Sequence, residues 1–281
     1  MTGTLFSFGH GYSAQALSRQ LKPNGWRIFG TTRDPAQSQA IRASGAEPVI
    51  WPGHTPELDG VTHLLISTAP NAQGDPVLAA MQDEIAERAA QFEWVGYLST
   101  TAVYGDHQGA WVDETTPATP TAERGKWRVH AEEQWRGIPG LPTHIFRLAG
   151  IYGPGRGPFS KLKRVGMRRI IKPGQVFSRI HVADIAQVLS ASMAAPNPGA
   201  IYNVCDDEPV PPQDVIAYAA ELQGLPLPPE VSFDEADMTP MARSFYNENK
   251  RVRNDRIKDE LGVSLHYPDY RVGLKSLMID D

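Results

Sequence analysis

Short apolar runs alternate with predicted helices through the first half of the chain. The runs predict β-strands over residues 5–8, 26–30, 48–51, 64–67, 94–99 and 144–147. Helices are predicted between them over 13–21, 35–44, 76–91 and 123–135. In the first of these, Ala14, Leu17 and Leu21 recur at helical spacing. Strands and helices that alternate in this way indicate a parallel sheet with helices on both faces.

The pattern becomes irregular after Gly150. It predicts a basic helix over 159–169, one more strand over 200–204, a helix over 212–222 and a mixed tail over 248–281. We expect this second half to fold over the carboxyl edge of the sheet, because open α/β folds place their ligands there. A smaller C-terminal region that binds a substrate is therefore predicted.

Composition and charge exclude several classes of protein. Of the 281 residues, 41% are hydrophobic and 21% are charged, which is ordinary for a globular chain. The net charge of −5 argues against a nucleic-acid partner, since such proteins are usually basic. No apolar run approaches the roughly 20 residues that span a bilayer, and the first residues lack the basic region of a signal peptide. With one cysteine and scattered histidines, we expect a cytoplasmic protein without disulfides, membrane contact or a metal site.

A glycine-rich turn follows the first predicted strand and opens the first predicted helix. It fits the pattern G-x-G-x-x-G/A in the order Gly9, His10, Gly11, Tyr12, Ser13 and Ala14. Gly9 permits the tight turn, and Gly11 lets the backbone approach a pyrophosphate. The N-terminus of the following helix supplies N–H groups and a partial positive charge. The turn predicts a dinucleotide site, and its six residues are predicted cofactor contacts.

The end of the second strand indicates which dinucleotide binds. An NAD site usually has an acidic residue there to hold the ribose hydroxyls, whereas Thr32 and Arg33 stand there in this chain. An arginine pairs with the 2′-phosphate of NADP, which a carboxylate would repel. Asp34 follows directly, so NAD stays the alternative. The predicted fold is a Rossmann-type doubly wound parallel sheet over 1–154 and 176–205, with the smaller substrate-binding region over 155–175 and 206–281.

Four further segments carry a resemblance to a known family. They read LSTTAVYG over 98–105, RLAGIYGP over 147–154, RIHVADI over 179–185 and IYNV over 201–204, and the tail over 250–262 agrees with them. In this order they resemble the extended short-chain dehydrogenase/reductase family, also called the NAD-dependent epimerase/dehydratase family, and its YeeZ-like branch. The resemblance covers most of the chain and implies an NAD(P)-binding protein.

The resemblance assigns roles to several residues. Thr100 stands where the family has a Ser or Thr that holds the substrate oxygen, and a hydroxyl suits a carbonyl or an alcohol. Small residues after the fourth strand let the cofactor lie close to the backbone. Further cofactor contacts that it implies are Thr68, Ala69, Pro70 and Ala149. In many relatives, helices that correspond to 76–91 and 123–135 form a dimer bundle, which implies a homodimer.

The family's proton-transferring pair is absent. Relatives carry a Tyr and, four residues later, a Lys on one helix face, but Arg124 and Arg128 occupy these positions here. An arginine stays protonated near neutral pH, so it cannot act as a general base. Arg128 can hold a ribose hydroxyl or a phosphate, and Arg124 can bind an anionic group. Tyr104 is the candidate proton donor in place of the missing tyrosine, with the substrate or water as the alternatives.

Basic residues gather where the substrate region begins. They are Arg156, Lys161, Lys163, Arg164, Arg168, Arg169, Lys172 and Arg179. Such a cluster favours an anionic small-molecule substrate, and Arg124, Arg156 and Arg179 are predicted to contact it. The alternative is a solvated amphipathic helix.

Three functions follow from these patterns. The first is an NADP-dependent oxidoreductase or epimerase with a non-standard active site. The second is a non-catalytic sensor or regulatory protein that binds NAD(P). A nucleotide-sugar enzyme ranks below both, since Gly150 stands where such enzymes often have an asparagine.

Overall fold

A seven-stranded sheet forms the centre of the protein in the computed structural model, which describes residues 2–53, 55–162 and 167–278. The strand order is β11-β7-β5-β4-β1-β2-β3, and every neighbouring pair is parallel. The strands are β1 (Thr4–Phe8), β2 (Arg27–Thr32), β3 (Glu47–Ile50), β4 (His63–Ile66), β5 (Trp94–Thr100), β7 (Thr143–Leu148) and β11 (Ile201–Val204). The seven predicted strands are confirmed to within two residues at each end.

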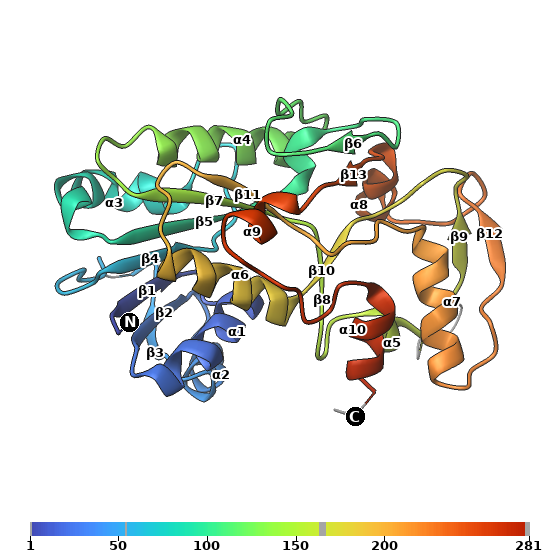
Figure 1. Cartoon of the computed structure of the whole chain (residues 1–281), viewed down its shortest axis with the longest axis horizontal. Coiled ribbons are helices and arrows are strands. Elements are labelled where there is room, and N and C mark those ends of the chain that lie inside the picture. The colour runs from blue at the N-terminus through green and yellow to red at the C-terminus, as the bar shows by residue number, and fades with distance from the viewer. Residues whose placement is uncertain (1, 54, 163–166, 279–281) are drawn as a thin grey trace.

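Helices cover both faces of this sheet. Figure 1 shows α3 (Pro76–Glu87) and α4 (Glu123–Arg136) above it, and α1 (Tyr12–Leu21), α2 (Ser38–Ala43) and α6 (Val182–Ala194) below it. A separate apolar core lies on each face, one with side chains from α1, α2 and α6 and the other with side chains from α3 and α4. Because both faces are covered, strands such as β4 and β7 are buried at every residue. The doubly wound Rossmann-type fold is confirmed.

The second half of the chain adds short elements beyond the sheet. Three pairs of strands are parallel: β8 (Gly150–Tyr152) with β10 (Arg179–His181), β9 (Arg169–Ile171) with β12 (Glu230–Ser232), and β6 (Trp111–Val112) with β13 (Arg251–Val252). The helices here are α5 (Pro158–Leu162), α7 (Pro212–Leu222), α8 (Pro240–Ser244), α9 (Asp255–Asp259) and α10 (Tyr270–Ser276). A third apolar core joins α5, α7 and α10.

The predicted basic helix over 159–169 is wrong at its end. The described part of α5 ends at Leu162, residues 167–168 are not helical, and Arg169 already belongs to β9, where it pairs with β12. Two residues of the predicted basic cluster, Lys163 and Arg164, lie outside the described residues. The backbone of β9 pairs with that of β12, which is distant in the sequence, and the local charge pattern does not reveal this.

Membrane-spanning helices and clusters of metal ligands are both absent from the described residues. No helix there is long and apolar enough to cross a membrane. Over the same residues, no three side chains of His, Cys, Asp or Glu are grouped so that they could hold a metal ion.

Candidate active site

The glycine turn joins β1 to α1 with an open backbone. Gly9 has a φ of +75°, and a Cβ there would lie 3.0 Å from the backbone nitrogen of Thr68. A Cβ on Gly11 would meet nothing closer than the Gly9 carbonyl at 3.8 Å. The Gly9 N–H donates to Thr31 Oγ1 at 2.7 Å, which holds the turn against β2. Gly11 caps α1 without a side-chain hydrogen bond, so the first N–H groups of the helix can receive an anion.

The side chain of His10 does not line this turn. It is 4% exposed and lies between α1 and β2, with Nε2 3.3 Å from Ser18 Oγ and 3.2 Å from Ser44 Oγ. A Cβ on Gly30 would come within 2.4 Å of the His10 ring, so the ring fills the space that this glycine leaves. Burial lowers the pKa of His10 to about 4. The predicted cofactor contact of His10 can therefore involve only its backbone, because its side chain is packed in the core.

The next residues of the turn are divided between core and surface. Ser13 and Ala14 are buried at the start of α1. Tyr12 instead reaches across to the loop after β8, where its hydroxyl donates to the Pro154 carbonyl at 2.9 Å. The Arg156 guanidinium lies over the Tyr12 ring, 5.6 Å from its centre. The predicted cofactor turn and a predicted substrate residue are thereby brought together by Tyr12.

The end of β2 separates an arginine from the acid that follows it. The Asp34 carboxylate accepts a hydrogen bond from the Ala36 N–H at 2.9 Å and caps the short 3₁₀ turn over Pro35–Gln37. The Thr32 hydroxyl donates to the Asp34 carbonyl and accepts a hydrogen bond from the Asp34 N–H. Arg33 is exposed and makes no ion pair or hydrogen bond with the described part of the chain. The cation is therefore available to a ligand, whereas the carboxylate is already engaged.

The carboxyl end of β4 is clamped by Arg128 from α4. One guanidinium nitrogen, Nη1, donates to the Leu98 carbonyl at 2.7 Å, to the Tyr97 hydroxyl at 3.1 Å and to the Thr68 carbonyl at 3.4 Å. Thr68 Oγ1 is buried and has no partner among the described residues. Ala69, which follows it, is exposed. Arg128 thus joins β4 to β5 where the resemblance places the cofactor, and its other two nitrogens make no hydrogen bond to the described chain.

The end of β5 separates the two predicted catalytic residues. Thr100 is half-buried, and its Oγ1 accepts from the Ala102 N–H at 3.2 Å to cap the 3₁₀ helix η4 (Thr101–Tyr104). Its own hydroxyl hydrogen remains to be donated. Tyr104 is fully buried: its hydroxyl donates to Asn203 Oδ1 at 2.7 Å, and burial raises its pKa to about 12. The assignment of Tyr104 as the proton donor stays a prediction that this geometry disfavours, since η4 turns its side chain into the core and its hydroxyl is engaged by Asn203.

The first turn of α4 places Arg124 beside α8. Arg124 is exposed, and its Nη1 lies 3.9 Å from the sulfur of Met241. A Cβ on the neighbouring Gly125 would lie 3.0 Å from the Ala102 carbonyl, so the start of α4 packs closely against η4. Arg124 and Thr100 therefore lie on elements in direct contact, as expected for one site.

Arg179 and Ala149 lie deeper. The Arg179 Nη1 donates to the Phe177 carbonyl at 2.8 Å and to the Val210 carbonyl at 3.3 Å. Nearby, Asp206 is 1% exposed, its carboxylate oxygens have no hydrogen-bond partner of normal geometry among the described residues, and burial raises its pKa well above the usual range. Ala149 is buried and donates its N–H to the Val204 carbonyl. Arg179 thus supports the fold here with two of its hydrogen bonds.

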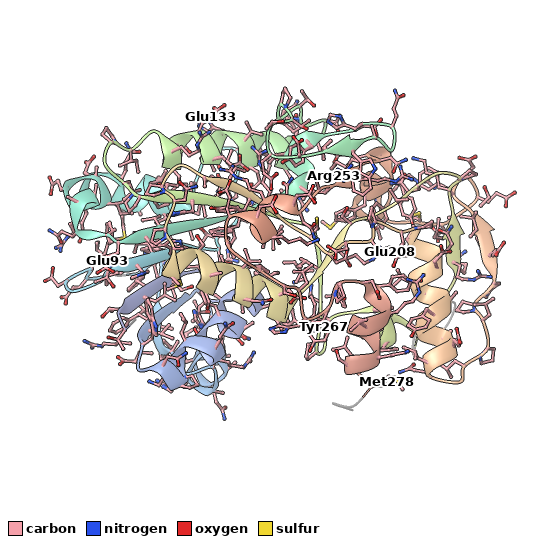
Figure 2. The ribbon with its side chains drawn as sticks, viewed as in Figure 1. Glu93, Glu133, Glu208, Arg253, Tyr267 and Met278 are labelled. Atoms are coloured by element: carbon pink, nitrogen blue, oxygen red, sulfur yellow. The ribbon has the colours of Figure 1, made fainter. Side chains whose placement is uncertain are left out.

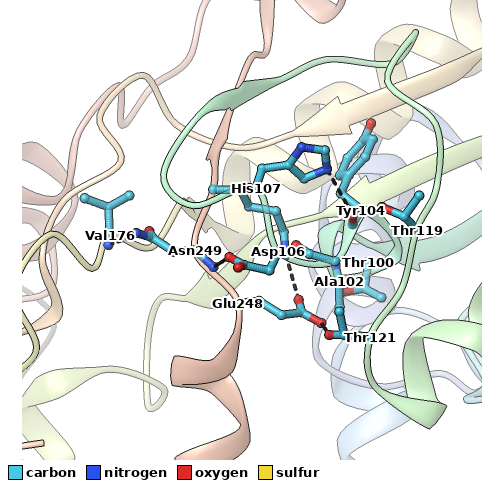
Figure 3. A network of polar contacts seen from close by, with 12 residues as sticks. Thr100, Ala102, Tyr104, Asp106, His107, Thr119, Thr121, Val176, Glu248 and Asn249 are labelled. Carbon is cyan, nitrogen blue, oxygen red and sulfur yellow. Dashed lines mark hydrogen bonds and ion pairs between the residues drawn. The ribbon is translucent and has the colours of Figure 1, made fainter.

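A polar segment from the tail completes the surroundings of η4, and the sequence patterns did not reveal it. Lys250 Nζ donates to the Gly105 carbonyl and to Glu248 Oε2, both at 2.7 Å. Thr121 Oγ1 donates to Glu248 Oε1 at 2.7 Å (Figure 3). Asn249, between them, accepts hydrogen bonds from three N–H groups. Its carbonyl accepts from His107 and Gly109, and its Oδ1 accepts from Val176. The one local signal is an acid and a base two residues apart, which share a face of an extended chain.

The chain is similar over nearly its whole length to a curated protein and to a solved structure. A scan against family models finds no match. The sequence is 29% identical to Protein YeeZ of Escherichia coli K12 over 276 residues, which cover 93% of this chain and 95% of YeeZ. A solved structure, described as a functionally unknown conserved protein from Silicibacter pomeroyi DSS, is 78% identical over 99% of both chains, with a TM-score of 0.98.

Two more distant structures share the fold and contain a dinucleotide. The human epimerase family protein SDR39U1 with NADPH is 16% identical over 99% of both chains, with a TM-score of 0.77. MoeE5 in complex with UDP-glucose and NAD is 18% identical over 99% of this chain and 98% of its own, with a TM-score of 0.75. Of these two structures, one thus contains NADPH and the other NAD.

Proposed function

This chain belongs to the YeeZ-like branch of the extended short-chain dehydrogenase/reductase family, and from that premise we propose that it is an NADP-dependent oxidoreductase or epimerase. The proposal rests on one observation above the others. At the end of β2, Arg33 is exposed and unpaired among the described residues, whereas the Asp34 carboxylate is engaged by the Ala36 N–H. A free guanidinium suits a 2′-phosphate, whereas one oxygen of the Asp34 carboxylate is already used to cap the following turn.

The residues present fit the cofactor. The turn at Gly9 and Gly11 and the uncapped start of α1 would receive the pyrophosphate, and Arg33 the 2′-phosphate. Arg128 and Thr68 would lie at the nicotinamide half, where Thr68 Oγ1 still needs a hydrogen-bond partner. The cofactor supplies a hydride when it is bound. The Thr100 hydroxyl would donate to the substrate oxygen, and with Tyr104 buried, the proton would come from water or from the substrate itself.

A variant at Arg33 tests the cofactor. We expect Arg33→Ala to weaken NADPH binding at least tenfold and to leave NADH binding unchanged, because only NADPH carries the 2′-phosphate. Fluorescence titration of both reduced cofactors measures this. Arg27→Ala, at the other end of the same strand, is the matched control and should change neither affinity. Equal losses for both cofactors, or none, would refute the NADP assignment.

The second candidate is an NAD(P)-binding protein without turnover. The two arginines at the family's Tyr and Lys positions and the burial of Tyr104 favour it, because none of the three can shuttle a proton. Absorbance of NADPH with a panel of carbonyl compounds separates the two candidates. Sustained oxidation that Thr100→Val abolishes supports the enzyme. Intact NADPH binding without oxidation of any panel member supports the sensor.

A further inference from the structure

The face of α4 that meets the carboxyl edge of the sheet carries two arginines in place of a tyrosine and a lysine. Arg124 and Arg128 are four residues apart, so their side chains share this face. Arg128 points to the ends of β4 and β5 through its bonds to the Thr68 and Leu98 carbonyls. Arg124 lies one turn nearer to the start of the helix, next to η4 and its neighbour Thr100. The face that would hold a proton donor is therefore cationic.

No carboxylate neutralises Arg124 among the described residues. Two acids of the surrounding segments, Glu123 in α4 and Glu248 after η5, are already paired with lysines. Glu123 forms an ion pair with Lys126 at 2.6 Å, and Glu248 forms one with Lys250 at 2.7 Å while also accepting from Thr121. The contact of Arg124 that remains is the weak one to the Met241 sulfur. An exposed guanidinium without an acid beside the proposed reaction centre favours an anionic ligand.

Large apolar side chains stand opposite this cation. Met241 in α8 is 52% exposed, and Phe245, four residues later in the 3₁₀ turn η5 (Phe245–Asn247), is 64% exposed. The spacing places them on one face, and Met241 shows that this face meets Arg124. Figure 1 shows α8 beyond the right-hand end of α4, close to β13. An exposed apolar patch with a charged side chain at its rim is a feature of ligand-binding surfaces.

The segment that presents them is firmly anchored. Tyr246 is buried, with its ring 5.4 Å from that of Phe177 and 5.2 Å from that of Phe233. Arg243 donates to the Phe233 and Ala236 carbonyls and lies over the Phe233 ring. Arg243 lies between Met241 and Phe245, and Tyr246 follows Phe245. Because both are fixed, the exposed side chains of Met241 and Phe245 form a preformed surface.

We propose that the substrate is a small amphipathic carboxylate whose anionic group pairs with Arg124 and whose aryl or alkyl body covers Met241 and Phe245. This deepens the proposed function, on which it rests, by naming a substrate class for the same site. A nucleotide sugar lacks such a body next to its charge, since its diphosphate lies between two polar sugars. Bidentate pairing of a carboxylate with a guanidinium would orient the ligand beside the Thr100 hydroxyl.

Calorimetric titration of the protein with saturating NADP⁺ tests the proposal. The probes are phenylacetate, 4-phenylbutanoate and octanoate, with phenylacetamide as the neutral counterpart and UDP-glucose as the competing class. We expect at least one carboxylate to bind, and to bind at least tenfold more tightly than phenylacetamide and UDP-glucose. Arg124→Gln and Phe245→Ala should each weaken that binding at least fivefold, because each removes one half of the recognition.

Arg136→Gln, at the opposite exposed end of α4, is the matched control and should bind as the wild type does. The proposal is overturned if no carboxylate binds, if phenylacetamide or UDP-glucose binds as well, or if Arg136→Gln loses as much as Arg124→Gln. Thermal unfolding confirms that each variant is folded. NADP⁺ affinity is measured for every variant, so that a failure of the proposed cofactor is seen separately from a failure of the proposed substrate class.

Discussion

At the scale of single residues, a buried ion pair lies next to the candidate site, between α4 and β7. Glu132 of α4 accepts from Arg147 of β7 at 2.7 Å, and both side chains are almost fully buried, at 5% and 6% exposed. Ser99 Oγ, next to Thr100, donates to the same carboxylate at 2.5 Å. The Arg147 guanidinium also lies over the Tyr104 ring. This pair joins α4, β5 and β7 directly behind Thr100.

Removal of one partner from this pair should be costly. We expect Glu132→Ala to lower the free energy of unfolding by about 3–5 kcal/mol, because it leaves the Arg147 charge buried without compensation. Urea unfolding followed by circular dichroism measures the change. Glu133→Ala is the control on the next residue, whose side chain points outward from α4 in Figure 2, and it should change stability by less than about 0.5 kcal/mol. Equal effects from the two variants would contradict this account.

The sequence predicted some of these residues well and others not at all. The phosphate turn was predictable, because glycines at fixed spacing after a strand impose the geometry that a pyrophosphate needs. The direction of Tyr104 was not, since the turn of η4 decides which way its side chain faces. Nor was the contact between Glu248 and Thr121, which are 127 residues apart and meet only in the folded chain.

At the scale of elements, the contact between α1 and β2 depends on an uncharged histidine. The His10 ring occupies the space above Gly30, and burial lowers its pKa to about 4. The unfolded chain binds a proton there near pH 6.5, whereas the folded chain does not bind it until near pH 4. The contribution of His10 to stability is therefore fully present above pH 6.5 and is lost as the pH falls toward 4.

This linkage predicts a loss of stability in mild acid. Between pH 6.5 and 4, His10 should lower the free energy of unfolding by roughly 3 kcal/mol, since each unit of pKa shift corresponds to about 1.4 kcal/mol. His63, whose pKa burial also lowers to about 4, should add a similar amount. Urea midpoints at successive pH values measure it. His10→Gln should make the curve shallower by the share that His10 contributes, and His130→Gln on the exposed side of α4 should leave it unchanged. A flat wild-type curve would contradict the assignment.

At the scale of the whole molecule, the outer surface of α3 and α4 bears on the expected homodimer. The exposed residues of these helices are small, polar or charged: Ala79, Ala80, Gln82, Asp83, Ala86, Glu87, Glu123, Arg124, Lys126, His130, Glu133 and Arg136. None of the large exposed apolar side chains in the described residues lies on either helix. Permanent homodimer interfaces have an apolar core, which this surface lacks.

We therefore expect a monomer in dilute solution, in contrast to the dimer that the family resemblance implies. Light scattering after size-exclusion chromatography should give a mass near 30.9 kDa at micromolar concentration. A mass near twice that value would contradict this expectation. If Arg136→Ala and Glu133→Ala then lowered the mass to that of one chain, polar contacts between α3 and α4 of the two copies would hold the dimer together.

The segment over 248–250 also determines when the site can form during synthesis. Chains emerge from the ribosome with the N-terminus first, at about 5–20 residues per second. All strands of the sheet and the glycine turn precede residue 205, whereas the partners of the Gly105 carbonyl and the Thr121 hydroxyl, Lys250 and Glu248, come later in the chain. The cofactor half is thus complete well before the substrate half. A chain interrupted between the two would retain the dinucleotide turn without a finished η4 region.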